Sequence, residues 1–236
     1  MHRQRLLQLL KEYALTSPDE KETITELIQY VSENQNCFER EAKDGARHIA
    51  ASVLLITRDF KKALFLWHTK IGRWTQPGGH ADGNSDLHSV ALKELEEETG
   101  IHGVQFVSSV PLDIYRFDYS PEVFGYQKSI YNLCFAAFVP EGQEPKIMEP
   151  EKCKEMCFAT PEEALSMIQA VHHEGTERLI RKWQALAKKK RSKGVAMLLS
   201  KRTINDVDIV VSLRSSIWKK TDGNWQMFFH QGTPIK

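Results

Sequence analysis

The chain opens with a pattern of hydrophobic and polar positions that predicts two helices. Residues 3–14 carry apolar side chains three or four positions apart, as one face of an amphipathic helix does. Ser17 and Pro18 then provide an N-cap and a first-turn proline for a second helix, which ends near residue 34. The pair is expected to form a helical extension over residues 1–45. Packing of its apolar stripes is the default role, with a lid or a dimer element as alternatives.

From residue 48 the pattern changes to short apolar runs that predict strands. These runs cover residues 49–57, 63–67, 104–107, 112–117, 129–139 and 156–158. Helical spacing returns between residues 86 and 99, where Gly100 supplies the C-cap, and again after a capping sequence at 160–163. Strands alternating with helices in this way indicate the α/β (α+β) class, here an α/β/α sandwich with a mixed sheet over residues 46–190.

A run of basic residues at 188–193 ends a further predicted helix and marks the edge of a third region. We interpret the run as a solvated helix end, with nucleic-acid contact or an address signal as alternatives. Apolar runs predict strands at residues 195–199, 207–213 and 225–229. The pair Asp222-Gly223 predicts a hairpin turn. Residues 191–236 are therefore expected to form a β-hairpin-rich C-terminal segment.

The composition limits the classes of function. The chain has 32 Lys and Arg against 31 Asp and Glu, and its formal net charge of +1 gives no reason to expect binding to nucleic acid or a membrane surface. The apolar runs are too short to span a bilayer, and the N-terminus lacks the apolar core of a signal peptide. The four cysteines form no CxxC pair and are expected to be free thiols, with a metal role for Cys153 and Cys157 as the alternative. We therefore expect a cytoplasmic protein.

The predicted helix at 86–99 carries the densest group of candidate functional residues. Glu94, Glu97 and Glu98 stand at positions i, i+3 and i+4, so they share one face over about one turn. Three carboxylates this close repel one another, and the repulsion is costly where they are partly buried. A hard divalent cation with oxygen ligands relieves it, and Mg²⁺ is the usual choice where phosphate oxygens complete the coordination shell.

The residues on either side of these glutamates favour a catalytic site over a solvated helix face. A glutamate-rich helix alone is most often a solvated face. Here Gly78 and Gly79 precede it, and such a pair lets the backbone turn sharply and brings a bare peptide group beside a metal or phosphate. Gly100 and Ile101 follow it directly. The combination, in this order and spacing, predicts a metal site.

In order and spacing, residues 79–101 resemble the Nudix box, the signature of hydrolases that cleave diphosphates linked to another moiety. The matching residues are Gly79, Glu94, Leu95, Glu97, Glu98, Gly100 and Ile101. The first glutamate of the pattern is replaced by Ser85, with Asp82 and Asp86 close by, and its arginine is replaced by Lys93. Lysine keeps the charge but lacks the planar fork that holds a carboxylate at two points.

This resemblance implies metal-assisted hydrolysis of a phosphoanhydride, with Mg²⁺ or Mn²⁺ as the cofactor. It implies that Glu97 and Glu98 ligate the metal and that Glu94 is a further ligand or the base for water. The carbonyl of Gly78 is an additional expected ligand. Other members of the family take one more acidic residue from outside the box, and the sequence does not choose among three candidates: Glu122, Glu149 and Glu151.

Substrate contacts are expected from residues near the glycine turn. Arg73 and Lys70 precede the turn and carry charges suited to a phosphate. Gly79 brings the backbone close, and His80 follows with either a positioning role or none. Five aromatic residues at or near strand positions are candidates to stack a base or to pack in the core: Trp67, Trp74, Tyr115, Phe117 and Tyr126.

A second resemblance concerns the C-terminal segment. Residues 194–236 are similar to the closing strands of SnoaL-like domains of the ketosteroid-isomerase superfamily, but the helices that complete that cone are not evident. Strands without their helices expose edges and an apolar face. The segment must therefore pack on the preceding domain, form a homodimer, or persist as the remnant of a gene fusion. No catalysis is assigned to it.

Together, these patterns predict hydrolysis of a small-molecule diphosphate. The expected substrate is a nucleoside diphosphate linked to another moiety, or a similar organic pyrophosphate, and the expected cofactor is Mg²⁺. An isomerase or decapping-type enzyme of the same fold is one alternative. A non-catalytic nucleotide-binding or regulatory module is another, and the retained Glu94, Glu97 and Glu98 argue against it.

Overall fold

The computed structural model describes residues 2–39, 47–119, 128–169, 174–199, 201–204, 207–211, 216–221, 224–230 and 233–234. The chain divides into two compact units, residues 1–183 and residues 184–236. No helix in the described ranges is long and apolar enough to cross a bilayer.

The first unit combines helices with a mixed sheet. Its helices are α1 (His2–Ala14), the 3-10 helix η1 (Pro18–Glu20), α2 (Lys21–Glu33), α3 (Leu87–Thr99), α5 (Pro161–Gln169) and the first part of α6 (Glu174–Leu199). Its strands are β1 (Arg47–Ile56), β2 (Ala63–His68), β3 (Arg73–Thr75), β4 (Gly78–His80), β5 (Gln105–Phe106), β6 (Asp113–Tyr119), β7 (Lys128–Phe138) and β8 (Cys153–Ala159).

Strand β1 organises the sheet and creates the space for the site. Among the described residues, eight strands form one sheet in the order β3-β2-β1-β7-β5, with β8 paired to β2 and β6 paired to β7. β1 runs parallel to β7 along its whole length. Its other edge is shared, because β4 pairs with residues 50–52 whereas β2 pairs at Ile56. Gly78 and Gly79, for which the sequence predicts a sharp turn, are instead the first two residues of β4 and pair with Ser52 and Ala51 of β1.

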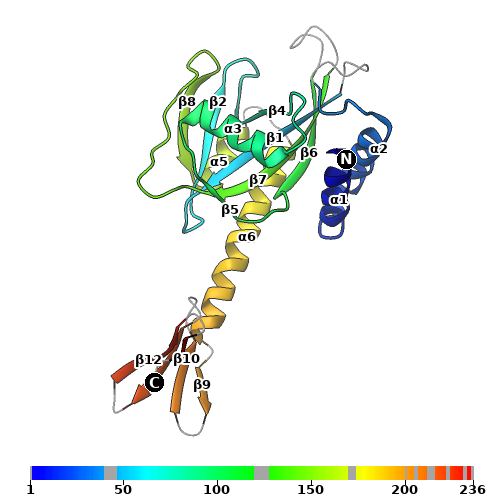
Figure 1. The fold of residues 1–236 in the computed structure, drawn as a ribbon. Coiled ribbons are helices and arrows are strands. Elements are labelled where there is room, and N and C mark those ends of the chain that lie inside the picture. Colours follow the sequence, from blue (N-terminus) through cyan, green and yellow to red (C-terminus); the bar gives the residue numbers. More distant parts are fainter. Residues whose placement is uncertain are drawn as a thin grey trace. The chain divides into compact units, whose positions relative to one another are not determined.

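Helices cover both faces of this sheet. Alternate residues of a strand point to opposite faces, and on β1 the neighbours Ile49 and Ala50 accordingly belong to different hydrophobic clusters. One cluster includes residues of α1, α2 and α3, and the other includes residues of α5 and α6. Figure 1 shows α3 on one side of the sheet and α5 and the first part of α6 on the other. The predicted α/β/α sandwich with a mixed sheet is therefore confirmed.

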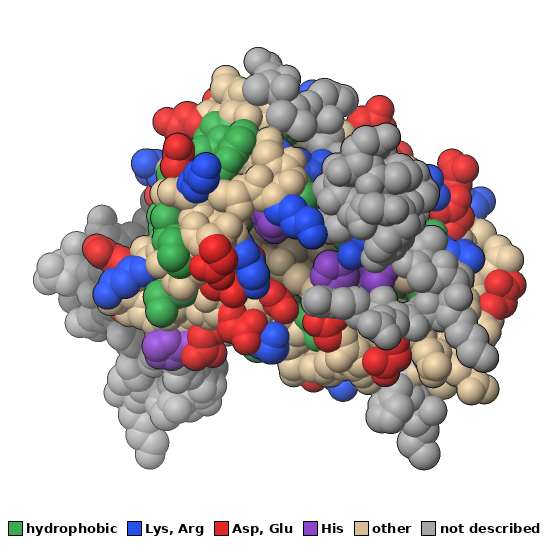
Figure 2. All heavy atoms as spheres, turned by 90° about the horizontal axis from the view of Figure 1, so that it is seen from above, with side chains coloured by type: hydrophobic (Ala, Val, Ile, Leu, Met, Phe, Trp, Pro, Cys, Tyr) green, Lys and Arg blue, Asp and Glu red, His purple; other side chains and the backbone are tan. Residues whose placement is uncertain are grey.

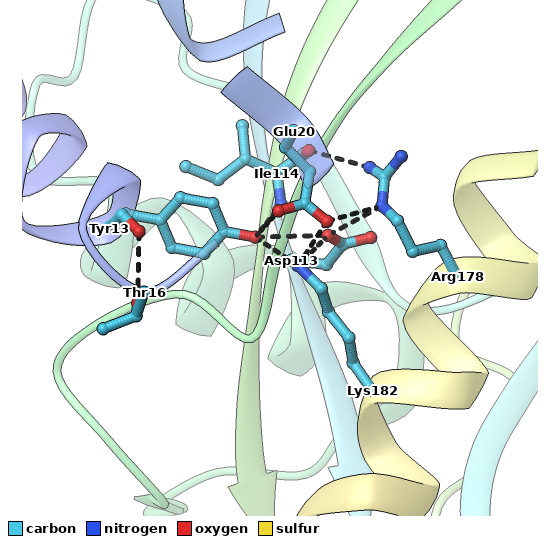
Figure 3. Close-up of polar contacts among 7 residues, drawn as sticks. All are labelled: Tyr13, Thr16, Glu20, Asp113, Ile114, Arg178 and Lys182. Atoms are coloured by element: carbon cyan, nitrogen blue, oxygen red, sulfur yellow. Dashed lines mark hydrogen bonds and ion pairs between the residues drawn. The ribbon is translucent and has the colours of Figure 1, made fainter. Parts of the chain in front are cut away.

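A buried cluster of charges fixes the N-terminal extension to the rest of the first unit. The side chains of Glu20 in η1 and Asp113 in β6 are fully buried, and Arg178 and Lys182 of α6 reach both carboxylates (Figure 3). The Nζ of Lys182 lies 2.6 Å from Glu20 Oε1 and 2.8 Å from Asp113 Oδ1. It also donates to the Tyr13 hydroxyl at 2.6 Å. The extension therefore packs on the unit, as its default role required, and charge pairs hold it there.

The pattern of the sequence misses some elements of the fold and misassigns one. β3 and β4 were not predicted as strands, because three residues give no readable alternation. The strand predicted at 195–199 is wrong, since these residues form the last part of α6. A short apolar run does not distinguish a strand from a helix, and here Ala196, Met197 and Leu198 are strong helix formers.

The second unit contains a separate antiparallel sheet. Within its described residues, five strands follow the order β13-β12-β11-β10-β9. They are β9 (Lys201–Ile204), β10 (Val207–Val211), β11 (Ser216–Thr221), β12 (Asn224–His230) and β13 (Thr233–Pro234). The strands predicted at 207–213 and 225–229 correspond to β10 and β12, and the turn predicted at 222–223 lies outside the described residues. The domain boundaries at 45 and 190 and the SnoaL-like resemblance stay predictions.

Candidate active site

Helix α3 is positioned by its caps and its buried face. Asp86 caps its start, because its carboxylate accepts from the backbone N–H of Ser89 at 3.5 Å and from the Ser89 hydroxyl at 2.9 Å. Gly100 ends it in the left-handed conformation, with φ of 70°, as predicted. The four apolar positions expected on its inner face are all buried: Leu87, Val90, Ala91 and Leu95. This burial fixes the rotation of the helix and so determines where its glutamates point.

The two glycines of β4 make room for the glutamates of α3. A Cβ on Gly79 would lie 2.3 Å from the carboxylate of Glu94, and a Cβ on Gly78 would lie 2.4 Å from the Cβ of Ser52. The N–H of Gly78 donates to Glu98 Oε2 at 3.0 Å. N–H and C=O of one strand residue point the same way, so the Gly78 carbonyl also faces away from β1. Its predicted role as a metal ligand is therefore sterically open.

Burial perturbs two of the three carboxylates. Only 6% of Glu98 is exposed, and burial raises the pKa of its carboxyl group to about 8, against the lowering effect of the Gly78 N–H. The charges of Glu94 and Glu149 add to this rise. Burial also raises the pKa of Glu94, which the charge of Lys93 opposes. A buried carboxylate with negative neighbours is a place where a cation is strongly favoured.

Lys93, which replaces the arginine of the Nudix pattern, still contacts the carboxylates. Its Nζ lies 2.9 Å from Glu97 Oε2 and 3.5 Å from Glu94 Oε1. Because 61% of the Lys93 side chain is exposed, solvent weakens these pairs. The lysine therefore orients two glutamates with single contacts, where an arginine would offer a planar fork.

Ser85, the other departure from the pattern, lies away from the glutamates. It lines a separate hollow of about 330 Å³ together with Arg3, Glu39 and Asn84. This hollow contains none of the three box glutamates among its lining residues. The substitution therefore alters the surroundings of the loop before α3, and it leaves the carboxylate face intact.

The box glutamates open into a larger cavity of about 520 Å³. Gly78, Gly79 and the three glutamates line it. Basic and imidazole groups also line it: His68, Lys70, Lys93 and Lys152. Apolar and aromatic side chains contribute to the same lining: Phe117, Tyr119 and Ile130. Figure 2 shows a face of the molecule on which acidic side chains gather beside basic and histidine side chains.

The predicted substrate-contact residues fall into two groups. Gly79, His80 and Lys70 line the cavity. The ring Nε2 of His80 lies 2.9 Å from Lys128 Nζ. Arg73 is not among the lining residues. Its guanidinium lies over the rings of Phe117 and Tyr119, at 4.7 and 5.1 Å from their centroids, and so helps to hold these two side chains in place.

The predicted aromatic residues likewise differ in whether they line the cavity or pack elsewhere in the unit. Phe117 lines the cavity, whereas Trp67 and Trp74 pack against each other with centroids 5.8 Å apart. Tyr115 is buried and hydrogen-bonds to Gln76. Tyr126 lies outside the described residues.

Sequence reasoning missed a buried polar network at the floor of the cavity. The hydroxyl of Ser52 accepts from Gln76 Nε2 at 3.1 Å and from Asn132 Nδ2 at 2.7 Å. All three residues line the cavity. The available signal was a polar residue inside an otherwise apolar strand, as with Ser52 in β1 and Asn132 in β7.

Among the candidate acids outside the box, Glu149 and Glu151 are near the site and Glu122 lies outside the described residues. Glu151 lines the cavity. Glu149 acts on Glu98 through its charge and accepts from Lys152 Nζ at 2.7 Å. Its partner Lys152 was not predicted as a site residue.

The oxygen donors of the site are of the chemical type that a hard divalent cation binds. In the structure, however, they do not point to one common position. In the part of the chain that the structure describes, no group of three His, Cys, Asp or Glu side chains is arranged to hold a metal ion. Ammonium groups and a backbone N–H engage Glu97, Glu149 and Glu98 instead. Mg²⁺ prefers oxygen ligands, and the site offers several. One of them is a buried carboxylate with a raised pKa, and the two glycines leave the approach to the site open. The side chain of Glu97 is 49% exposed and therefore has room to rotate toward a bound cation.

Comparison with known proteins shows the family. Residues 46–182, more than half of the chain, match the family model described as the NUDIX domain, and the chain belongs to the Nudix family. Two Arabidopsis thaliana relatives, "Nudix hydrolase 27, chloroplastic" and "Nudix hydrolase 25", are each 38% identical, over 50 and 52 residues. These matches cover 21% and 22% of this chain, and only 22% and 29% of the relatives.

A solved structure gives a further comparison. The fold is similar to that of a C. elegans Ap4A hydrolase, with a TM-score of 0.48 and 19% identity, over 60% of this chain and 98% of that one.

Gly79→Ala is expected to weaken metal binding without unfolding the protein. The three atoms nearest to the new Cβ all belong to the flexible end of Glu94, which can move away. Displacing a ligand or its support typically costs about 10–100-fold in metal affinity. Mn²⁺ titration by electron paramagnetic resonance measures this loss.

Gly78→Ala is the contrast, because its Cβ meets backbone atoms of β1. Overpacking of that kind costs about 1–3 kcal/mol of stability. Unchanged Mn²⁺ affinity in Gly79→Ala would contradict the placement of Glu94.

Proposed function

We propose that this protein hydrolyses a phosphoanhydride bond in a nucleoside diphosphate linked to another moiety, or in a similar organic pyrophosphate, with Mg²⁺ as its cofactor. The observation that carries the proposal is the arrangement of charge in one cavity. Three carboxylates of α3 line this cavity together with the ammonium groups of Lys70 and Lys152. A diphosphate with a divalent cation has the complementary charges, since the cation suits the carboxylates and the phosphate oxygens suit the ammonium groups.

The cofactor would be held by carboxylates of Glu97 and Glu98, with Glu94 and the Gly78 carbonyl as further donors. When bound, Mg²⁺ neutralises the negative charge that develops on the phosphate oxygens. Glu94 is a ligand or the base that takes a proton from the attacking water; its half-buried carboxylate beside Gly79 suits either role. The Gly78 N–H fixes Glu98 Oε2 from the side of β4.

The other residues of the cavity bind and orient the substrate. The ammonium groups of Lys70 and Lys152 are placed to contact phosphate oxygens. Phe117, Tyr119 and Ile130 offer an apolar surface for the organic half, and two aromatic rings favour a planar group such as a nucleobase.

The acid from outside the box is assigned to Glu149 in this proposal. Its charge already acts on Glu98, and its second oxygen, Oε2, is buried without a hydrogen-bond partner in the described part of the chain. A buried acceptor of this kind calls for a cation or a proton. Glu151 lines the cavity, but the charge that is seen to act on Glu98 is that of Glu149.

A matched pair of compounds tests the reaction class. With Mg²⁺, the protein should hydrolyse a nucleoside diphosphate sugar at the anhydride and leave the corresponding nucleoside monophosphate intact. A chelator should abolish turnover, and Mn²⁺ should restore it. Equal hydrolysis of the monophosphate, or turnover that a chelator does not affect, would overturn the proposal.

The alternative function is a nucleotide-binding module without turnover. One observation favours it, namely that the carboxylates do not converge as they stand in the described residues. It predicts binding of one of the nucleotides by calorimetry with no product formed in the presence of Mg²⁺ or Mn²⁺.

A further inference from the structure

Lys152 belongs to a tight turn that packs against the end of α3. Within this turn, the backbone N–H groups of Lys152 and Cys153 donate to the Glu149 carbonyl at 3.0 and 2.9 Å. The preceding Met148 N–H donates to the carbonyl of Glu98 at 3.2 Å. The turn therefore has a fixed position relative to Glu98, and it presents the side chain of Lys152 to the cavity.

The ammonium group of Lys152 lies in the field of three carboxylates. Its Nζ donates to Glu149 Oε1 at 2.7 Å. The hydrogen bond with Glu149 is the largest cause of a raised pKa at Lys152, and the charges of Glu94 and Glu98 contribute in the same direction. At Glu98, where burial raises the pKa, Lys152 in turn acts to lower it. One positive group thus offsets negative charge in the region where the proposed cation would bind.

We propose that Lys152 is an internal counter-ion of the carboxylate site, which gives way to the divalent cation and then binds the phosphate of the substrate. The inference rests on the proposed function and goes beyond it, because it makes Lys152 the residue that couples cation binding to substrate binding.

Electrostatics predicts how Lys152 affects the binding of the cation and the binding of the substrate. An ammonium group and a divalent cation compete for the same negative field, so the cation alone binds against the repulsion of Lys152. A bound diphosphate adds negative charge at the cavity and offers Lys152 new acceptors in place of Glu149. Release of Lys152 also frees Glu149 to approach the cation. Cation and substrate therefore strengthen each other's binding, and the coupling is reciprocal.

A merely structural role for Lys152 makes a different prediction. If its contact with Glu149 only anchors the turn, removing the contact would loosen the loop beside Glu98 and weaken cation binding. The counter-ion role predicts the opposite sign for the cation alone. Whether removal of the Lys152 ammonium group strengthens or weakens binding of the cation alone therefore distinguishes the two roles.

The test uses the full chain and two probes, Mn²⁺ alone and methylenediphosphonate, a diphosphate analogue that cannot be hydrolysed. Lys152→Met is expected to bind Mn²⁺ alone about tenfold more tightly than wild type, because a competing charge is gone. At saturating Mn²⁺ it should bind the analogue about tenfold more weakly, because a charge-assisted contact is lost. Lys152→Gln, which keeps length and polarity, should change both affinities in the same directions.

Lys154→Met is the matched control, since Lys154 lies two residues further along, is exposed and is not among the residues that line the cavity. It should bind both probes as wild type does. Mn²⁺ affinity that is unchanged or weaker in both Lys152 variants, or analogue affinity that is unchanged, would overturn the inference. Failure of the proposed function looks different, because wild type itself would then bind Mn²⁺ no better than Glu98→Gln does.

Discussion

Glu98→Gln should lower the rate of metal-dependent hydrolysis about a thousandfold while the protein stays folded. Glutamine has the same shape, and its amide oxygen still accepts from the Gly78 N–H, so packing at this buried position is retained. The substitution removes the negative charge that the cation requires. Steady-state kinetics with Mg²⁺ measures the loss, and circular dichroism verifies the fold.

Glu96→Gln is the control for this experiment. Glu96 belongs to the same helix but is exposed and does not line the cavity. It should keep the wild-type rate within about twofold, because an exposed charge outside the cavity has a small effect on groups inside it. A Glu98→Gln protein that retains wild-type activity would show that the carboxylate face of α3 does not hold the cofactor.

Asp113→Ala should destabilise the protein by about 3–5 kcal/mol, the usual cost of removing one partner from a buried charge pair. Asp113 Oδ1 lies 2.8 Å from Lys182 Nζ and 3.2 Å from Arg178 Nε (Figure 3). Without this carboxylate, two cations share the single negative charge of Glu20. The midpoint of urea unfolding, together with the slope, measures the free energy of unfolding.

A surface pair on the same strand provides the comparison. Asp118 contacts Arg116 at 3.0 Å, and its side chain is 44% exposed. Asp118→Ala should therefore cost no more than about 1 kcal/mol. Equal losses for the two variants would show that the buried cluster does not hold the N-terminal extension in place.

The part of the site that could be predicted from the sequence is local. Glu94, Glu97 and Glu98 lie within one turn of a helix whose start and end are marked by Asp86 and Gly100. Helical periodicity alone fixes their common face, and the Gly78-Gly79 pair precedes the helix in the sequence. Contacts between residues a few positions apart follow from the geometry of one helix, so a single sequence is enough to predict them.

The remaining parts depend on pairings between distant segments. Lys152 reaches the site because its turn hydrogen-bonds to the end of α3, and Ser52 meets Asn132 because β1 and β7 are neighbours in the sheet. No local spacing indicates these contacts. Likewise Asp113 reads as an ordinary residue at the start of a strand, and its burial becomes evident only once α6 brings Lys182 to it.

The most direct test of the central claim is ³¹P nuclear magnetic resonance of the wild-type protein with a panel of nucleotides, nucleotide sugars and dinucleoside polyphosphates. With Mg²⁺ or Mn²⁺ present, we expect the anhydride signals of at least one compound to disappear and new phosphomonoester signals to replace them. A panel in which a compound binds but every anhydride signal persists would contradict hydrolysis by this protein.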